Sequence, residues 1–137
     1  MTKVFIDTNI LLDVIAKQGS FFGPAAKVWT LAEQNFIEAY VSAISFNNLY
    51  YIVRKIEGHA KAIKALHMVR DIFTSVPPDQ KILDQAMDSE IKDFEDAVQY
   101  FSANHARVDY LITRNPDDFP TSPLKILTAS EFVATLK

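Results

Sequence analysis

The chain has 137 residues, a length typical of one domain, and 49% of them are hydrophobic, which supplies a core and excludes a disordered chain. It has no cysteine, which excludes disulfides, thiolate metal sites and a cysteine nucleophile. The net charge of −3 excludes a general, charge-driven nucleic-acid binder, so contact with nucleic acid would need a local basic patch or a bound cation.

The hydrophobic residues are spread along the chain. No apolar run approaches the ~20 residues that span a bilayer, and the apolar stretch near the start is too short for a signal peptide. We therefore expect a cytoplasmic protein without a membrane segment.

The first half of the sequence predicts two short strands, each followed by helices. Asp7 or Thr8 is suited to cap the first helix, Pro24 to begin the second, and Gly58 to separate the third from the fourth. The predicted elements are a strand over 3–6, a helix over 8–16, a turn over 19–24, a helix to about 34, a strand over 38–42, and helices over about 45–57 and 59–71.

The second half continues the alternation. Pro77 and Pro78 stop a strand, Asp79 caps a helix, and the chain breaks again at Asn115-Pro116. The predicted elements are strands over 73–76, 109–115 and 124–127, helices to about 87 and within 89–106, and a last helix capped by Thr128 or Ser130. Alternating strands and helices predict a single α/β domain over residues 1–137, a three-layer α/β/α sandwich with a central parallel sheet of four to five strands.

Polar side chains follow the first and fourth predicted strands. Most aspartates lie on surfaces or cap helices, and Asp13 and Asp88 need no other explanation. Asp7, however, directly follows the first strand, and Asn115 and Asp118 follow the fourth. Because ligands of open α/β sheets bind outside the carboxyl ends of the strands, these groups mark a candidate site.

The helix from about Asp93 adds further acids. Asp93, Asp96 and Tyr100 fall within about 60° of one another around the helix axis, beside an apolar stripe. Helix capping alone would explain Asp93. Carboxylates crowded at one strand edge repel one another, and Mg²⁺ or Mn²⁺ would remove that repulsion.

A basic stretch lies between these acids, in "YYIVRKIEGHAKAIKALHMVR". It has two interpretations: a surface for an RNA backbone with an aromatic side chain for stacking, or the solvated face of two helices, which the acidic total favours. Arg114 is at the edge of the candidate site, where it could hold a phosphate.

Two motifs resemble the PIN domain, the metal-dependent ribonuclease fold that includes VapC-type toxins. "VFIDTNILLD" is similar to the family's opening strand and first acid, and "DFEDAVQYFSANHARVDYLITRNPDDF" resembles its second half. "VSAISFNNLYYIV" is a weaker match to the central motif. The order of strands and helices agrees, so the resemblance covers essentially the whole chain.

The resemblance implies metal ligands and catalytic residues. Asp7 matches the first metal-binding acid, Asp96 the acid that opens the "DA" helix, and Asn115 the position after "TR", with Asp118 as a nearby acid. Thr8 and Thr113 match hydroxyl positions beside the site.

One departure concerns activity. The central motif of the family normally ends in Glu-Leu, whereas here it ends in Asn48-Leu49. An amide can coordinate through its carbonyl oxygen but brings no charge and cannot act as a base. Asp93 or Asp118 is positioned to supply the negative charge that Asn48 lacks.

Three hypotheses follow. The first is an endoribonuclease that uses Mg²⁺ or Mn²⁺ held by Asp7, Asp96, Asn115 and Asp118, with Thr8, Asn48, Thr113 and Arg114 contacting the RNA substrate. As the toxin of a toxin–antitoxin pair it would bind an antitoxin protein and form a homodimer. The second is a PIN-fold module that binds RNA or protein without cleavage, and the third is a flavodoxin-like or receiver-like signalling domain.

Overall fold

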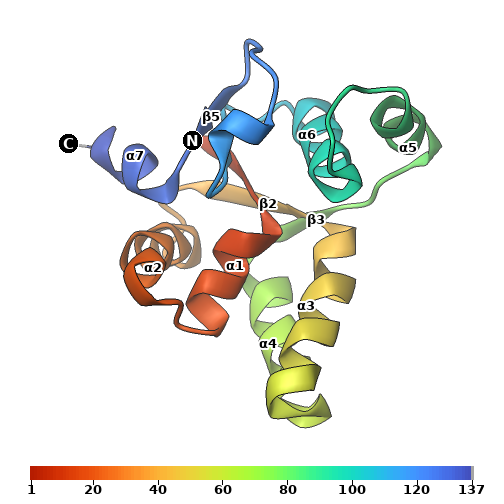
Figure 1. Ribbon diagram of the computed structural model, residues 1–137. Helices are drawn as coiled ribbons and strands as arrows, with labels where there is room; N and C mark the ends of the chain where they lie inside the picture. Colours follow the sequence, from red (N-terminus) through yellow and green to blue (C-terminus); the bar gives the residue numbers. More distant parts are fainter. Residues whose placement is uncertain (137) are drawn as a thin grey trace.

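The computed structural model describes residues 1–136 and contains a central sheet of five parallel strands (Figure 1). Their order across the sheet is β3-β2-β1-β4-β5. Pairing places Phe5 beside Tyr40 on one side and beside Leu111 on the other, so β1 lies at the centre. The strands are β1 Lys3–Ile6, β2 Glu38–Ser42, β3 Thr74–Val76, β4 Tyr110–Ile112 and β5 Lys125–Leu127.

Seven α-helices and one short 3₁₀-helix connect these strands within the described residues. The α-helices are α1 Thr8–Ile15, α2 Gly19–Glu33, α3 Ala43–Glu57, α4 His59–Ile72, α5 Gln80–Met87, α6 Phe94–Ala106 and α7 Ala129–Ala134, and the 3₁₀-helix η1 spans Pro116–Asp118. None of the helices described is both long and apolar enough to cross a bilayer.

Alternating side chains of β1 face two different cores, which accounts for the layers. Val4 and Ile6 pack with residues of α1, α2, α3 and α7, whereas Phe5 packs with Tyr100 and Ala103 of α6. Helix α5 packs against the outer side of α6 through Ile82 and Ala86. The predicted three-layer α/β/α sandwich with a parallel sheet is therefore confirmed, since helices cover both faces of the sheet (Figure 1).

Predicted caps define several helix starts. Asp79 accepts a hydrogen bond from the Ile82 backbone N–H at 2.9 Å, and Thr128 forms a capping box with Glu131. Ser42 caps α3, which therefore begins earlier than predicted.

The predicted turn over 19–24 is wrong, because α2 already begins at Gly19 and contains Pro24. The chain reverses just before it, where Lys17 and Gly19 have φ values of 51° and 45°. Residues 89–93, placed within a helix by the sequence pattern, instead form a loop that ends at the N-cap Asp93.

The strand order also decides between folds. Flavodoxin-like and receiver-like domains have the order 2-1-3-4-5, whereas this sheet has the order 3-2-1-4-5. The flavodoxin-like or receiver-like hypothesis is therefore wrong.

Candidate active site

Asp7 lies at the carboxyl end of the central strand and is only 3% exposed. Its Oδ2 accepts a hydrogen bond from the Thr113 hydroxyl at 2.7 Å, and its Oδ1 accepts one from Gln99 Nε2 at 3.0 Å. In the orientation that satisfies its amide, Asn9 Nδ2 donates to both oxygens, at 2.9 and 3.0 Å. Asp7 is also the N-cap of α1, since its side chain accepts from the Asn9 backbone N–H at 3.5 Å.

Burial raises the pKa of the Asp7 carboxyl above its ordinary value, and the negative charge of Glu95 adds to the rise. The donors on Thr113, Gln99 and Asn9 act in the opposite direction because they stabilise the ionised form. Asp7 is thus a buried carboxylate whose direct hydrogen bonds all come from neutral donors.

A second network joins α1, α3 and α6 beside Asp7. The Thr8 hydroxyl lies 2.6 Å from the Ser45 hydroxyl and donates to Glu95 Oε2 at 2.8 Å. The backbone N–H of Thr8 donates to Gln99 Oε1 at 3.1 Å. Gln99 is fully buried and therefore holds Asp7 with one end of its amide and Thr8 with the other.

Asp96 lies in the first turn of α6, whose N-cap Asp93 accepts a hydrogen bond from the Asp96 backbone N–H at 2.9 Å. Partial burial, followed by repulsion from Asp7, Asp93, Asp118 and Glu95, raises the pKa of Asp96 to about 7. Carboxylates from three separate parts of the chain therefore act on one another at this point.

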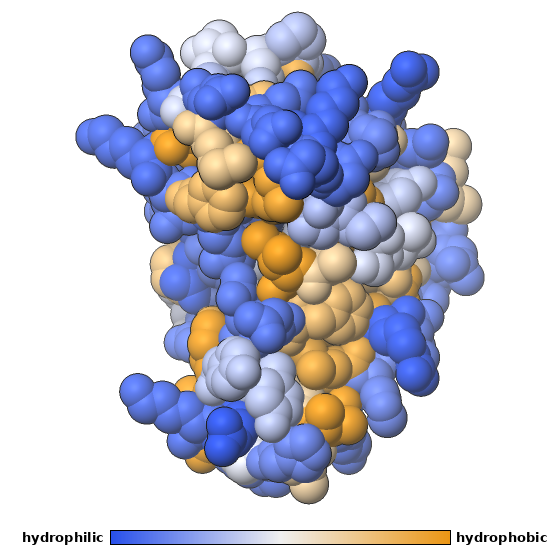
Figure 2. Space-filling model, turned by 90° about the vertical axis from the view of Figure 1, so that its right-hand side faces the viewer, coloured by the Kyte–Doolittle hydropathy of each residue, from blue (hydrophilic) through white to orange (hydrophobic). Residues whose placement is uncertain are grey.

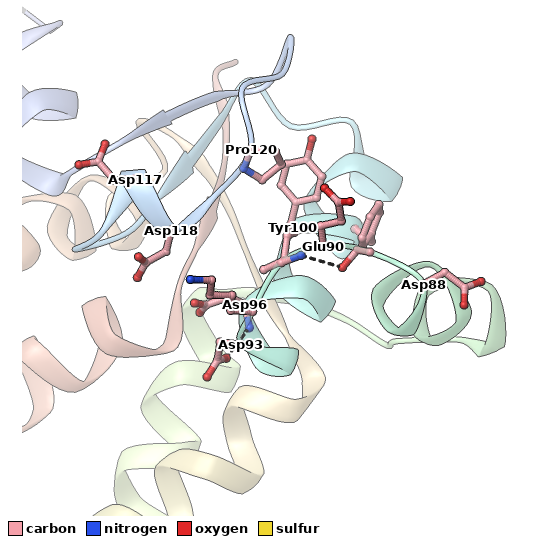
Figure 3. Close-up of a pocket in the computed structure, with 12 residues that line it drawn as sticks. Asp88, Glu90, Asp93, Asp96, Tyr100, Asp117, Asp118 and Pro120 are labelled. Atoms are coloured by element: carbon pink, nitrogen blue, oxygen red, sulfur yellow. Dashed lines mark hydrogen bonds between the residues drawn. The ribbon is translucent and has the colours of Figure 1, made fainter.

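Two adjoining cavities meet at Asp93 and Asp96. The smaller, of about 280 Å³, contains Asp7 and Thr8 together with Asn48 and Glu95. The larger, of about 700 Å³, lies between the α5–α6 loop and the β4 exit loop, residues 113–118, and is lined by further acids and aromatic side chains. Figure 3 shows Asp118 on the exit loop pointing toward Asp96, with Asp93 on the far side of Asp96. We place the candidate site in the smaller cavity because it contains Asp7.

The β4 exit loop brings some of the predicted residues to this edge. Thr113 is buried against Asp7, and its hydroxyl also accepts a hydrogen bond from the Asn115 backbone N–H at 3.3 Å. Asn115 itself is exposed and lines neither cavity, whereas Asp118 lines the larger one.

Arg114 is placed differently from the sequence-based expectation. Its guanidinium forms an ion pair with Asp13 and lines neither acidic cavity. Asp13, which needed no special explanation as a surface or capping residue, is 1% exposed, so that interpretation is wrong. A buried carboxylate of this kind requires a cationic partner, and Arg114 supplies it.

The sequence profile of the PIN domain matches residues 3–117. The chain belongs to the PIN domain family. No curated protein sequence matches the chain.

Solved structures with a similar fold include a toxin, a toxin–antitoxin complex and a VapBC complex. A chain of the DNA-bound VapBC complex from Salmonella typhimurium is 14% identical with a TM-score of 0.71, and the match covers 94% of this chain and 99% of that one. A toxin–antitoxin complex from Klebsiella pneumoniae gives 23% identity, a TM-score of 0.64 and coverage of 90% and 99%. VapC20 from Mycobacterium tuberculosis is described as a Sarcin-Ricin loop cleaving toxin. It is 15% identical with a TM-score of 0.65, and the match covers 79% of this chain and 86% of that one.

Three polar residues of this PIN domain site were not found from the sequence. Glu95 and Gln99 lie in the quoted motif but were not singled out, and Asn9 lies two residues after Asp7. Gln99 had a detectable signal, because it lies three residues after Asp96 on the predicted helix and is a polar residue among apolar neighbours. Glu95 and Asn9 had none, since each is explained as an exposed helix residue.

The donor chemistry of the PIN domain site fits a hard divalent cation. Carboxylates and amides supply the oxygen ligands that Mg²⁺ and Mn²⁺ prefer. After burial, repulsion from four neighbouring acids contributes to the raised pKa of Asp96, as expected where negative charge is crowded. Among residues 1–136, no three acidic or histidine side chains lie close enough to form a metal centre by themselves. Mg²⁺ is compatible with such a site because it is commonly bound by one or two carboxylates and keeps several waters.

Apolar surface adjoins the acidic cavity. Ile52 of α3 lines the cavity and is 38% exposed, and Phe94 at the start of α6 is 51% exposed. Figure 2 shows apolar side chains gathered in the lower middle of the face that lies to the right in Figure 1, with hydrophilic surface above. The PIN domain therefore presents an acidic hollow next to an apolar surface.

Proposed function

We propose that this PIN domain is a Mg²⁺- or Mn²⁺-dependent endoribonuclease and the toxin of a toxin–antitoxin pair. The observation that carries the proposal is the convergence of Asp7, Glu95 and Asp96 in one cavity, with Asp118 beside it, at the carboxyl edge of the sheet. The description of VapC20 as a toxin that cleaves the Sarcin-Ricin loop supports RNA as the substrate.

In the proposed site, Asp7 and Asp96 hold the cation, and Asn115 and Asp118 complete the set from the β4 exit loop. When bound, the cation supplies a Lewis acid for the phosphodiester. Thr113 and Gln99 favour the ionised form of the buried Asp7 carboxyl and fix its orientation. Asn9 is the donor on Asp7 that is not fully buried, so we propose that it moves aside on cation binding.

Glu95 compensates in this proposal for the amide at Asn48. Both residues line the cavity that contains Asp7, and Glu95 already contributes negative charge that raises the pKa of Asp96. Thr8 orients Glu95 through its hydroxyl, while Asn48 is left to contact RNA. Arg114 is not carried into the substrate site, because its guanidinium is bonded to Asp13.

An antitoxin is the proposed protein partner. The relatives from Salmonella typhimurium and Klebsiella pneumoniae are complexes of this kind, and the apolar surface beside the cavity offers a contact area. A homodimer and a cytoplasmic location complete the proposal.

Cleavage of a pool of single-stranded and structured RNA tests the enzyme. Wild type is compared with Asp7→Asn, in Mn²⁺, in Mg²⁺ and in EDTA, and with Asp71→Asn as a control on an exposed α4 acid. We expect cleavage that requires metal, is lost in Asp7→Asn and persists in Asp71→Asn. Cleavage in EDTA, or full activity of Asp7→Asn, would contradict the proposed roles.

A second candidate is a PIN module that binds RNA or protein without cleaving. Amides at Asn48 and Asn115 favour it, and so does the finding that no three acidic or histidine side chains of residues 1–136 lie close enough to hold one metal ion by themselves. RNA binding that is independent of metal, with no cleavage at any divalent cation concentration, would support this candidate over the enzyme.

A further inference from the structure

The inference concerns the buried ion pair between α1 and the β4 exit loop. The Arg114 Nε donates to Asp13 Oδ2 at 3.0 Å and the Arg114 Nη2 donates to Asp13 Oδ1, so the guanidinium grips both carboxylate oxygens. The Asp13 side chain is 1% exposed and that of Arg114 is 27% exposed. A bidentate pair fixes the direction of both side chains, which a single contact does not.

A third element restrains the same guanidinium. The Arg114 Cζ lies 4.3 Å from the centroid of the Phe21 ring, in a cation–π arrangement. Phe21 belongs to α2 and Asp13 to α1, and the three side chains line one small cavity of about 260 Å³. Arg114 is thus held from two helices at once.

The residues on either side of Arg114 belong to the acidic site. Thr113 donates to Asp7 and accepts from the Asn115 backbone, and the Asp118 backbone N–H donates to the Asn115 carbonyl at 3.0 Å. β4 ends at Ile112, and the Thr113 backbone N–H still donates to the Leu127 carbonyl of β5 at 2.9 Å. Among the described residues, 114–118 make no backbone hydrogen bond to a strand. The only ion pair that the described residues of this loop make is the one at Arg114.

We infer that Arg114 and Asp13 are positioning residues, which clamp the β4 exit loop so that Thr113 faces Asp7 and Asp118 lies near Asp96. The inference rests on the proposed function only in treating that edge as the reactive one. Neither residue lines either cavity that contains Asp96, so beyond the attraction between the charges of Arg114 and Asp7 their effect on the site passes through the loop.

The experiment must distinguish this positioning role from one in which the Asp13–Arg114 pair only stabilises the fold. Replacing a buried ion pair by apolar residues of similar volume often leaves stability unchanged or raises it, whereas removing one partner is strongly destabilising. The double variant Asp13→Leu/Arg114→Met therefore keeps the packing but removes the directional grip. Glu57→Leu/Lys61→Met is the matched control, because that pair lies on exposed surface of α3 and α4.

Two measurements are made on each folded variant. Amide hydrogen exchange of Asn115 and Asp118 reports local opening of the loop, and calorimetry reports the affinity of the site for Mn²⁺. For the Asp13/Arg114 double variant we expect exchange about tenfold faster, the factor that corresponds to ~1.4 kcal/mol of easier local opening. We expect Mn²⁺ affinity to fall by about 10- to 100-fold, as for other residues that orient ligands. The control pair should change neither quantity.

Wild-type exchange and wild-type Mn²⁺ affinity in the folded double variant would overturn the inference. Should that variant not fold, Arg114→Lys replaces it, since lysine keeps the charge but loses the two-point grip. Faster exchange in Arg114→Lys supports the clamp, and unchanged exchange refutes it. Hydrogen exchange does not depend on catalysis, so wild type that binds no Mn²⁺ would refute the proposed function while the clamp is still judged by exchange.

Discussion

Replacing Asp96 by asparagine should stabilise the metal-free protein at high pH. The pKa of Asp96 is raised from 3.8 to about 7, which means that the folded state holds this proton more tightly than the unfolded state. Below about pH 4 both states are protonated and Asp96 costs nothing. As the pH rises toward 7 the unfolded state loses the proton first, so the free energy of unfolding falls.

The size of the effect follows from the difference between the two pKa values. Without screening, a change from 3.8 to about 7 corresponds to about 4 kcal/mol at ~1.4 kcal/mol per unit. Asp96 is only partly buried, so solvent screens both the cost of burying its charge and the repulsion from the neighbouring acids, and we expect about 1–2 kcal/mol at pH 8. Asp7 contributes in the same direction, but it is present in both proteins and largely cancels in the comparison.

Urea denaturation in EDTA, followed by circular dichroism at pH 5 and pH 8, measures this difference. Asp96→Asn should exceed wild type in stability by more at pH 8 than at pH 5. Adding Mn²⁺ at pH 8 should stabilise wild type more than the variant, because the variant lacks the carboxylate proposed as a ligand. Asp71→Asn makes the same change of net charge on an exposed site and is the control.

Parallel stability curves of Asp96→Asn and wild type between pH 5 and pH 8 would refute the reasoning. They would mean that Asp96 has an ordinary pKa, and that the acids around it do not repel one another as the geometry indicates. If Asp71→Asn gained as much stability between pH 5 and pH 8 as Asp96→Asn, the effect would come from net charge and the reasoning would likewise be refuted.

Two further substitutions test the support and the composition of the site. Gln99→Leu removes a buried hydrogen bond to the Asp7 carboxylate and leaves the Thr8 backbone N–H unpaired. We therefore expect the free energy of unfolding, measured with urea, to fall by about 3–5 kcal/mol. A fall below ~0.5 kcal/mol, as expected for the exposed control Gln85→Leu, would contradict the bridging role of Gln99. Asn48→Glu adds a carboxylate to the cavity that contains Asp7, so it should tighten Mn²⁺ binding about tenfold in calorimetry, which is equivalent to ~1.4 kcal/mol. The control Asn47→Glu, on an exposed residue, should leave the affinity unchanged. Equal Mn²⁺ affinities in the two variants would place residue 48 outside the cation site.

The sequence was sufficient for the order of elements, because hydrophobic periodicity and capping residues act over a few neighbours. It also located Asp7 and Asp96, since both follow signals of local structure: the end of an apolar strand and the start of a helix. The start of α2 was missed because the reversal before it depends on a positive φ at Lys17, a residue type that gives no such signal.

Residues whose roles depend on tertiary contacts could not be predicted in the same way. Asp13 is buried, and its ionic partner Arg114 lies 101 positions away in sequence. Glu95 and Thr8 meet across 87 positions. No local pattern distinguishes such residues from solvated ones. Because charged side chains are mostly exposed, the sequence alone favours a surface position for Asp13 and Glu95.

The position of β1 at the centre of the sheet has a consequence for protein synthesis. β1 is made first, yet its carboxyl edge is completed by β4, which pairs Val4 with Tyr110 and Ile6 with Ile112. The Thr113 that orients Asp7 arrives still later. A ribosome must therefore pass Thr113, 106 positions after Asp7, before the acidic edge exists, and nascent chains that end before Thr113 carry Asp7 without the site around it.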